Sequence, residues 1–251
     1  MDPLIFVVAL GAAVAGFVQG LSGFAFGLVA MSFWAWTVEP RLAAGLAVFG
    51  ALTGQVIAAF SVRRGFNLKL LLPFLIGGLA GIPIGVAVLP RLDVQLFKTI
   101  LGMLLVVWCP VMLFARHLPA IRFGGHAADG AIGLIGGVMG GIGGFTGAIP
   151  TLWCTLRQME KDTQRSIIQN FNLATLAFTM AAYVATGTVT RAMLPMFAVV
   201  APAMLIPTLL GARLYIGISE ATFRRIVLSL LTVSGVALLA SSLPRLIAGQ
   251  G

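Results

Sequence analysis

The sequence has few charged residues: Asp, Glu, Lys and Arg make up 9% of its 251 residues, whereas hydrophobic residues make up 59%. The mean hydropathy is +1.06. This composition excludes a soluble globular protein, because the chain has more apolar side chain than a soluble core could bury. The charges fall in short clusters between uncharged runs that reach or exceed the roughly 20 residues a helix needs to cross a bilayer. The sequence therefore predicts an integral membrane protein.

Carboxylates and histidines are scarce as well, at seven and two residues. They lie at or near the ends of uncharged runs or in the central connector, so the sequence offers no obvious proton carrier at the membrane midplane. It contains no His-x-x-x-His pair, Walker-type phosphate loop, Gly-x-Ser-x-Gly elbow or clustered metal ligands. We therefore expect no enzyme activity, catalytic residue, metal or cofactor.

The chain has only two cysteines, Cys109 and Cys154, and both lie inside uncharged runs. A buried free cysteine behaves as a small hydrophobic residue, so packing is the expected role. Cys154 lies near a glycine-rich stretch, which leaves sulfur transfer as the sharper alternative for this thiol. The net charge of +9 comes from Lys and Arg in the connectors. These residues form no basic face, so membrane orientation rather than nucleic-acid binding explains the charge.

Two uncharged runs are too long for a single crossing. As one helix, the 36 residues from Pro3 to Val38 would be about 54 Å long, against a hydrocarbon core of about 30 Å. The run from Gly130 to Leu156 has nine glycines between Gly130 and Gly147. A helix break there costs little. Each run is therefore predicted to fold back as a helical hairpin that returns to its starting side.

Comparison of the chain with itself indicates a duplication. "GFVQGLSGF" and "GVMGGIGGF" match at four of nine positions, namely Gly16/Gly137, Gly20/Gly141, Gly23/Gly144 and Phe24/Phe145. Phe97-Lys98 and Phe223-Arg224 match at nearly the same offset. Five helical segments in each half place the second half upside down relative to the first, with eleven of the sixteen Lys and Arg residues inside.

We therefore predict an all-α polytopic membrane bundle, an inverted five-plus-five repeat with two glycine-broken helical hairpins. The predicted units are a first membrane repeat at residues 1–115, a cytoplasmic linker at 116–127 and a second repeat at 128–251. Both termini are expected outside.

The stretches "GLSGFAFG" and "GIGGFTGA" are the predicted breaks. A broken helix exposes unpaired backbone N–H groups and the positive end of its dipole, which suits an anion where water is scarce. Paired broken helices in inverted repeats are a recurring transporter plan. We predict a midplane site where residues 22–24 face residues 143–145. The predicted substrate-binding residues are Gln19, Ser22, Gly23, Phe24, Gly143, Gly144, Phe145, Thr146 and Asn172.

Close packing is the alternative role for these glycines. It is the expected role for two ladders of small residues, Gly77/Gly81/Gly85 and Gly133/Gly137/Gly141. Further polar residues in or near the uncharged runs are the pathway candidates Thr53, Gln55, Arg165, Gln169 and Thr175. Buried polar groups in lipid mark either interhelical hydrogen bonds or a polar pathway, and the sequence leaves both open. For Arg165 the alternatives are snorkelling to the interface and attraction of an exiting anion.

Tryptophans near the end of the first broken run provide a further expectation. Trp34 and Trp36 approach its outer end and are expected in the interfacial aromatic belt.

Several motifs in combination resemble one family: "GFVQGLSGF", "GGVMGGIGGFTGAIP", "RSIIQNFNLATLAF", and "LIPTLLGARL" followed by "FRRIVLSLL". They look like the TauE/SafE family of sulfite exporters, in the 4-toluene sulfonate uptake permease (TSUP) superfamily. The resemblance covers nearly the whole chain and implies a multi-pass transporter of sulfur-containing anions, such as sulfite or organosulfonates, in the bacterial inner membrane. Related sequences commonly have a Gly-Gly-Pro turn where this chain has Gly143-Gly144-Phe145, so the exact substrate stays open.

The expected function is export or facilitated exchange of a small anion. A potential of 100 mV, negative inside, drives anions outward by about 2.3 kcal/mol per charge. The expected partners are the anionic substrate and membrane lipid, with no nucleic acid, and homo-oligomerisation is left open. The alternative is an anion channel or a membrane-embedded assembly subunit without transport activity.

Overall fold

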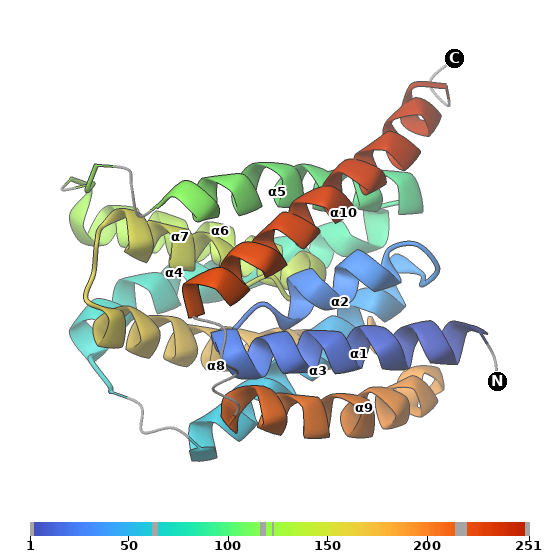
Figure 1. Ribbon diagram of the computed structural model, residues 1–251, viewed down its shortest axis with the longest axis horizontal. Coiled ribbons are helices and arrows are strands. Elements are labelled where there is room, and N and C mark those ends of the chain that lie inside the picture. Colours follow the sequence, from blue (N-terminus) through green and yellow to red (C-terminus); the bar gives the residue numbers. More distant parts are fainter. Residues whose placement is uncertain (1–2, 62–64, 116–118, 122, 214–219, 249–251) are drawn as a thin grey trace.

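A computed structural model describes residues 3–61, 65–115, 119–121, 123–213 and 220–248. These residues form ten α-helices and no strand, so the all-α prediction is confirmed (Figure 1). The first five helices are α1 (Pro3–Ser22), α2 (Phe26–Trp34), α3 (Pro40–Ser61), α4 (Leu68–Val88) and α5 (Val94–Phe114). The second five are α6 (Gly125–Gly143), α7 (Ala148–Leu156), α8 (Lys161–Ala185), α9 (Leu194–Arg213) and α10 (Glu220–Ala248). Short 3-10 turns, η1 (Leu89–Arg91) and η3 (Arg191–Met193), adjoin α4 and α9.

Helix length and surface chemistry both indicate a membrane protein. Within the described part of the chain, seven helices are long and apolar enough to cross a membrane: α1, α3, α4, α5, α8, α9 and α10. The nine-residue helices α2 and α7 are each only about 14 Å long and cannot cross alone. Large apolar side chains face outward, such as Phe60 at 89% exposure and Ile206 at 66%. The multi-pass prediction is therefore confirmed.

Each half begins with a long helix followed by a short one that folds back. In the first hairpin, Trp34 Nε1 at the end of α2 donates a hydrogen bond to the carbonyl oxygen of Val8, near the start of α1, over 3.3 Å. In the second, Trp153 near the end of α7 reaches Asp129 near the start of α6. The predicted return of each broken run is confirmed. The expectation for Trp34 is wrong, because its ring is fully buried in this packing, whereas Trp36 is 42% exposed.

The long helix of each hairpin packs on the fourth helix of the other half. Gly16 and Gly20 of α1 lie against Met204 and Thr208 of α9, so these two helices run parallel. The same holds for α6 and α4, which form the most extensive helix pair in the structure. There the two predicted ladders interlock, with Gly77 and Gly81 on the backbone of α6 and Gly133, Gly137 and Gly141 on the backbone of α4. The packing role of both ladders is confirmed.

The last helices of the two halves pack on each other. They run antiparallel, with Thr99 Oγ1 of α5 donating to Ser242 Oγ of α10 over 2.8 Å. A two-fold axis in the membrane plane produces this set of contacts. It relates the parallel α1–α9 pair to the parallel α6–α4 pair, and it makes the α5–α10 pair antiparallel. The arrangement is therefore that of an inverted five-plus-five repeat.

The positions of the first and last helix ends are consistent with an inverted repeat. The start of α1 and the end of α10 lie at the same end of the bundle (Figure 1).

Helix α6 already begins at Gly125, inside the predicted linker 116–127, while residues 116–118 and 122 lie outside the described residues. The division into repeats 1–115 and 128–251 stays a prediction.

Candidate functional site

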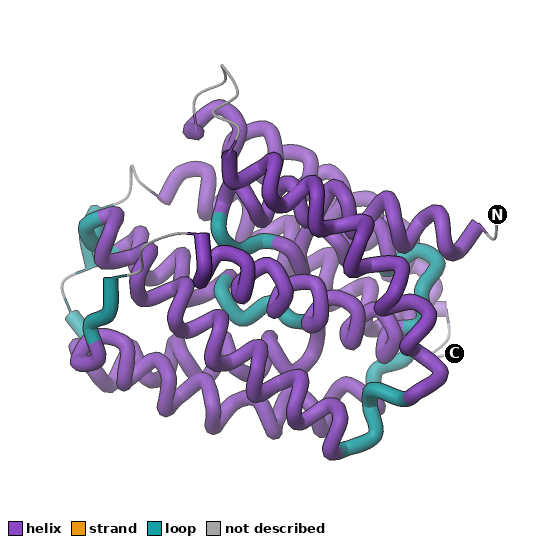
Figure 2. The backbone as a smooth tube through the Cα atoms, turned by 90° about the horizontal axis from the view of Figure 1, so that it is seen from below, coloured by secondary structure: helices purple, strands orange, loops and turns teal. Residues whose placement is uncertain are grey.

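Two helix breaks lie at equivalent positions of the two halves. Gly23 follows α1 with φ +80°, and Gly144 follows α6 with φ +76°. Both values fall in the left-handed region that glycine adopts without steric cost. Figure 2 shows two short loop segments, drawn in teal, enclosed within the helical bundle. The prediction of two glycine-broken hairpins is therefore confirmed.

Both breaks lie well inside the helical bundle, away from the ends of the spanning helices. A Cβ on Gly23 would lie 3.5 Å from Nε2 of Gln169 on α8, and one on Gly144 would lie 3.3 Å from Val48 on α3. Gln169 and Val48 are each the ninth residue of their helix, about 12 Å from its start. Because α3 and α8 run in opposite directions, each hairpin turn lies slightly beyond the mid-length of these spanning helices, counted from the end where the hairpin begins.

The two hairpins meet at Gly27, in the first turn of α2. A Cβ on Gly27 would lie 3.0 Å from the carbonyl oxygen of Gly144 and 3.3 Å from that of Gly143. Of the residues expected to face one another, Phe24, Gly144 and Phe145 line one cavity, whereas Gly27 rather than Gly23 lies beside Gly144. The turn of the first hairpin and the turn of the second do not lie at the same height in the bundle. The start of α2, rather than the turn at Gly23, therefore lies beside Gly144.

A cavity of about 20 Å³ lies at this junction, with room for about one water molecule. Its lining combines the start of α2, the turn before α7 and side chains of α1, α3 and α8. Seven of the predicted residues line it: Gln19, Phe24, Gln55, Gly144, Phe145, Thr146 and Asn172. Seven others do not: Ser22, Gly23, Gly143, Thr53, Arg165, Gln169 and Thr175.

Local hydrogen bonds explain why three of these residues stay out of the cavity. The hydroxyl of Ser22 donates to the carbonyl of Val18 in its own helix over 2.8 Å, and Ser22 is exposed. Thr53 and Thr175 likewise donate to carbonyls one turn earlier in their own helices. A hydroxyl that donates its single hydrogen to its own helix cannot also donate to a bound anion. Arg165 is exposed near the start of α8, as expected for a snorkelling cation.

The cavity lining carries unpaired backbone donors. Within the described residues, no backbone carbonyl accepts from the amides of Phe26, Gly27 and Leu28, which begin α2. At the start of α7, Ala148 N donates to the carbonyl of Phe145 over 3.2 Å, while the amide of Ile149 has no such partner. Free N–H groups are expected in the first turn of any helix. Here the first turn of α2 and the start of α7 at Ala148 border one partly open cavity.

Side-chain amides fasten the first hairpin beside the cavity. Gln19 Nε2 donates to the carbonyl of Ala51 over 3.0 Å, and Gln55 Nε2 donates to that of Gly23 over 2.7 Å. Both amides are therefore committed to backbone oxygens. They hold α1 and its turn against α3.

Asn172 presents a free donor to the same cavity. Its Oδ1 accepts a hydrogen bond from Thr146 Oγ1 over 2.8 Å, and the residue is 2% exposed. No described residue accepts from its Nδ2. At the Gly23 turn, outside the cavity lining, Gln169 Nε2 is buried without a partner in the described part of the chain. Unmatched buried donors are costly, and they favour a polar ligand or water nearby.

Trp108 of α5 contacts two residues that line the cavity, Ala148 and Phe24. Its Nε1 donates to the carbonyl of Ala148 over 2.9 Å, and its ring meets Phe24 edge-on at 6.4 Å between centroids. The start of α7 and the first hairpin turn are thus held by one aromatic side chain.

A family model described as sulfite exporter TauE/SafE matches residues 8–238, which include both hairpins and the cavity. The chain belongs to the TauE/SafE family. No curated protein and no solved structure matches it. Family membership identifies a membrane transporter, and the family's description points to sulfite or related anions as its cargo.

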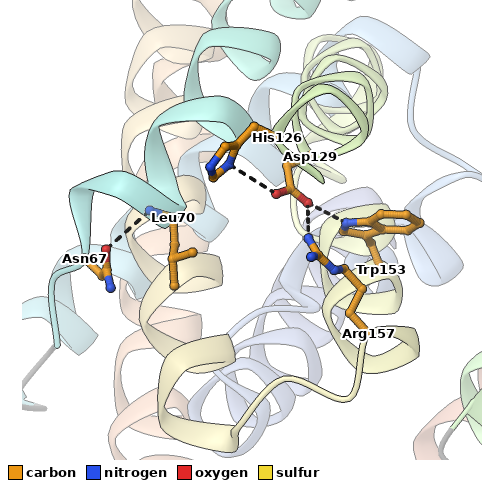
Figure 3. Close-up of polar contacts among 6 residues, drawn as sticks. All are labelled: Asn67, Leu70, His126, Asp129, Trp153 and Arg157. Atoms are coloured by element: carbon orange, nitrogen blue, oxygen red, sulfur yellow. Dashed lines mark hydrogen bonds and ion pairs between the residues drawn. The ribbon is translucent and has the colours of Figure 1, made fainter. Parts of the chain in front are cut away.

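This TauE/SafE protein also contains a buried charge cluster that the sequence did not reveal. Asp129 is 3% exposed, and its carboxylate accepts hydrogen bonds from Arg157 and from Trp153 Nε1, each over 2.8 Å (Figure 3). His126 Nδ1 lies 3.9 Å from the same carboxylate. The cluster ties the end of α7 to the start of α6. In the equivalent place of the first hairpin, Trp34 bonds a backbone carbonyl instead.

A sequence signal for this cluster does exist. The offset of 121 residues that relates Gly23 to Gly144 also relates Val8 to Asp129, so a carboxylate replaces an apolar residue in the second repeat. The same close-up shows Asn67, whose side chain accepts from the amide of Leu70 over 3.3 Å and caps the start of α4 (Figure 3).

Cys154 of this transporter lies in an apolar cluster with Leu71, Phe74, Ile167, Ile168 and Phe171, and it is fully buried. This environment fits the packing role, and the sulfur does not line the cavity. Within the described residues, no group of three or more His, Cys, Asp or Glu side chains could hold a metal ion.

Proposed function

We propose that this protein carries a small sulfur-containing anion, such as sulfite or an organosulfonate, across the bacterial inner membrane. The anion would be held where the N-terminal ends of α2 and α7 converge near the midplane. The observation that carries the proposal is that the first turn of α2 and the first residue of α7, Ala148, line one cavity together with the turn before α7. Helix N-termini bind oxyanions because free N–H groups and the dipole both favour negative charge.

Neutral side chains would complete the site. Asn172 Nδ2 lies at the cavity and can donate to an oxyanion, while the hydroxyl of Thr146 donates to Asn172 Oδ1 and so orients this amide. A sulfite or sulfonate group carries three oxygens in a pyramid, so donors from several directions suit its shape. Phe24 and Phe145 add apolar surface to the lining, and Trp108 packs edge-on against Phe24.

The size of the cavity supports a carrier that changes shape. A space for about one water molecule is too small for an anion of four or more heavy atoms. Binding therefore requires the hairpins to move apart at the Gly27–Gly144 contact. Rocking of one repeat against the other about this contact is a known mode of alternating access in inverted repeats. A membrane potential that is negative inside then favours export.

The test uses purified protein in liposomes and counterflow of radiolabelled sulfite. Asn172→Leu removes the free amide from the cavity, and Asn170→Leu is the matched control, since Asn170 bonds the carbonyls of Gly65 and Ser166. We expect Asn172→Leu to lower counterflow by about tenfold, a loss of roughly 1.4 kcal/mol of binding. The control should stay near wild type. Equal flux in both variants, or passive conductance without counterflow, would refute the proposal.

A further inference from the structure

Among the described residues, only neutral ones line the cavity between the hairpins. Its lining consists of Gln19, Phe24, Ala25, Phe26, Gly27, Leu28, Ala51, Gln55, Gly144, Phe145, Thr146, Gly147, Ala148, Asn172 and Leu176, all of them neutral. The positive charge available to an anion must therefore come from the backbone.

Two helix ends supply that charge. Each N-terminus contributes about +0.5 of an elementary charge through its dipole and free N–H groups. The starts of α2 and α7 both line the cavity. Together they offer about one positive charge, which matches one negative charge.

The neutral side chains add hydrogen bonds but no net positive charge. Gln19 and Gln55 already donate to the carbonyls of Ala51 and Gly23. Asn172 Nδ2 is the unpartnered amide of the lining, judged over the described residues, and Asn172 is 2% exposed. Carbonyl oxygens of Gly143 and Gly144 also lie at the junction, close to Gly27, and they repel negative charge. A second negative charge would remain uncompensated in a medium where bare charge is very unfavourable.

We infer that the site selects singly charged anions over doubly charged ones. Resting on the proposed function, this inference defines the substrate class as hydrogen sulfite and monosulfonates rather than sulfate, thiosulfate or the sulfite dianion. Each turnover then moves one negative charge. It follows that sulfite transport increases as acidification converts the dianion to hydrogen sulfite.

Methanesulfonate and sulfate provide the direct test. They have nearly the same size and tetrahedral shape, and at neutral pH the first carries one negative charge and the second carries two. Both are added as competitors of radiolabelled sulfite counterflow in liposomes that contain the full-length protein. We expect methanesulfonate to compete about tenfold more strongly than sulfate.

The outcomes separate the inference from the proposed function. Equal or stronger competition by sulfate overturns the inference while sulfite counterflow still supports the anion site. Sulfite counterflow that neither competitor reduces also overturns the inference, because a monosulfonate must enter a monoanion site. Absence of sulfite counterflow refutes the proposed function itself.

A charge-adding variant gives a second measurement. Gln55→Arg places a permanently charged guanidinium at the cavity, and Gln55→Met is the uncharged control. We expect the arginine variant to shift the preference toward sulfate by about tenfold relative to the methionine variant. A folded arginine variant with an unchanged preference contradicts the inference. If the variant does not fold, the competition on the unmodified protein still decides.

Discussion

Gly27 and Gly144 bring the two halves of the chain into contact at the centre of the bundle: a Cβ on Gly27 would lie 3.0 Å from the carbonyl oxygen of Gly144. The contact joins the start of α2 in the first hairpin to the turn that precedes α7 in the second. Because both residues also line the cavity, we expect a movement that widens it to change the separation of these two backbones.

Adding one methyl group at this contact is predicted to impair transport. In Gly27→Ala the new Cβ would lie 3.0 Å from the Gly144 carbonyl oxygen, a shorter distance than most Cβ atoms in proteins have to a neighbour. One of the two backbones must therefore shift by a few tenths of an ångström. We expect sulfite counterflow to fall by about tenfold without loss of membrane insertion. The matched control is Gly130→Ala, whose Cβ would meet its nearest atom, the carbonyl oxygen of Pro73, at 3.6 Å. Comparable flux in the two variants would show that the contact is not part of the transport cycle.

The orientation of Asn172 is predicted to depend on Thr146. Thr146→Val keeps the shape of the side chain but removes the hydrogen bond to Asn172 Oδ1, leaving a buried acceptor unpaired at a cost of about 1–3 kcal/mol. We expect the apparent affinity for sulfite to weaken by about tenfold. Thr179→Val is the control, because buried Thr179 bonds only the carbonyl of Thr175 in its own helix. If both substitutions change affinity equally, Thr146 has no specific role at the site.

The Asp129–Arg157 pair is predicted to stabilise the second hairpin. Asp129→Asn removes the charge that Arg157 faces over 2.8 Å, and the arginine side chain is 24% exposed. We expect a cost of about 2 kcal/mol, below the roughly 3–5 kcal/mol for a fully buried pair, seen as a lower melting temperature in detergent. Asp129→Asn combined with Arg157→Gln should recover part of the loss, since neither charge is then left alone. Strictly additive effects of the two changes would exclude direct coupling.

Close packing of α4 on α6 is predicted to tolerate no added volume. Gly81 lies against the backbone of α6, where a Cβ would meet the carbonyl oxygen of Leu134 and approach Val138 N to 2.9 Å. We expect Gly81→Ala to separate the helices, at a cost of about 1–3 kcal/mol, and to reduce the yield of folded protein. Gly130→Ala, in the same helix pair, has room for its methyl group and should leave yield and melting temperature unchanged. A fully stable Gly81 variant would mean that this interface is looser than its geometry indicates.

Much of the fold could be predicted because its causes are local in the chain. Runs of apolar residues specify membrane helices wherever they reach bilayer length, and the run from Pro3 to Val38 exceeded that length. The matching glycines at 23 and 144 located both breaks, since left-handed backbone favours glycine. The positive-inside rule then gave the inverted orientation.

The candidate site was predicted only in part, because helix rotation and depth depend on packing between distant segments. The sequence pattern could not show that Gly27 rather than Gly23 meets Gly144. It also could not separate Gln55 and Asn172, which line the cavity, from Thr53 and Thr175, which bond their own helices. The burial of Trp34 and Asp129 was missed for the same reason.

By itself, the sequence determined a membrane protein with two equivalent glycine breaks in oppositely oriented halves, because hydropathy, glycine content and connector charge act over short stretches of chain. Only the tertiary structure decided that both short helices begin at one small neutral cavity and that Asp129 finds Arg157. Those relationships depend on how α1 packs on α9 and how α6 packs on α4. These helices are far apart in the sequence, so their contacts are set by the assembled bundle and not by any one segment.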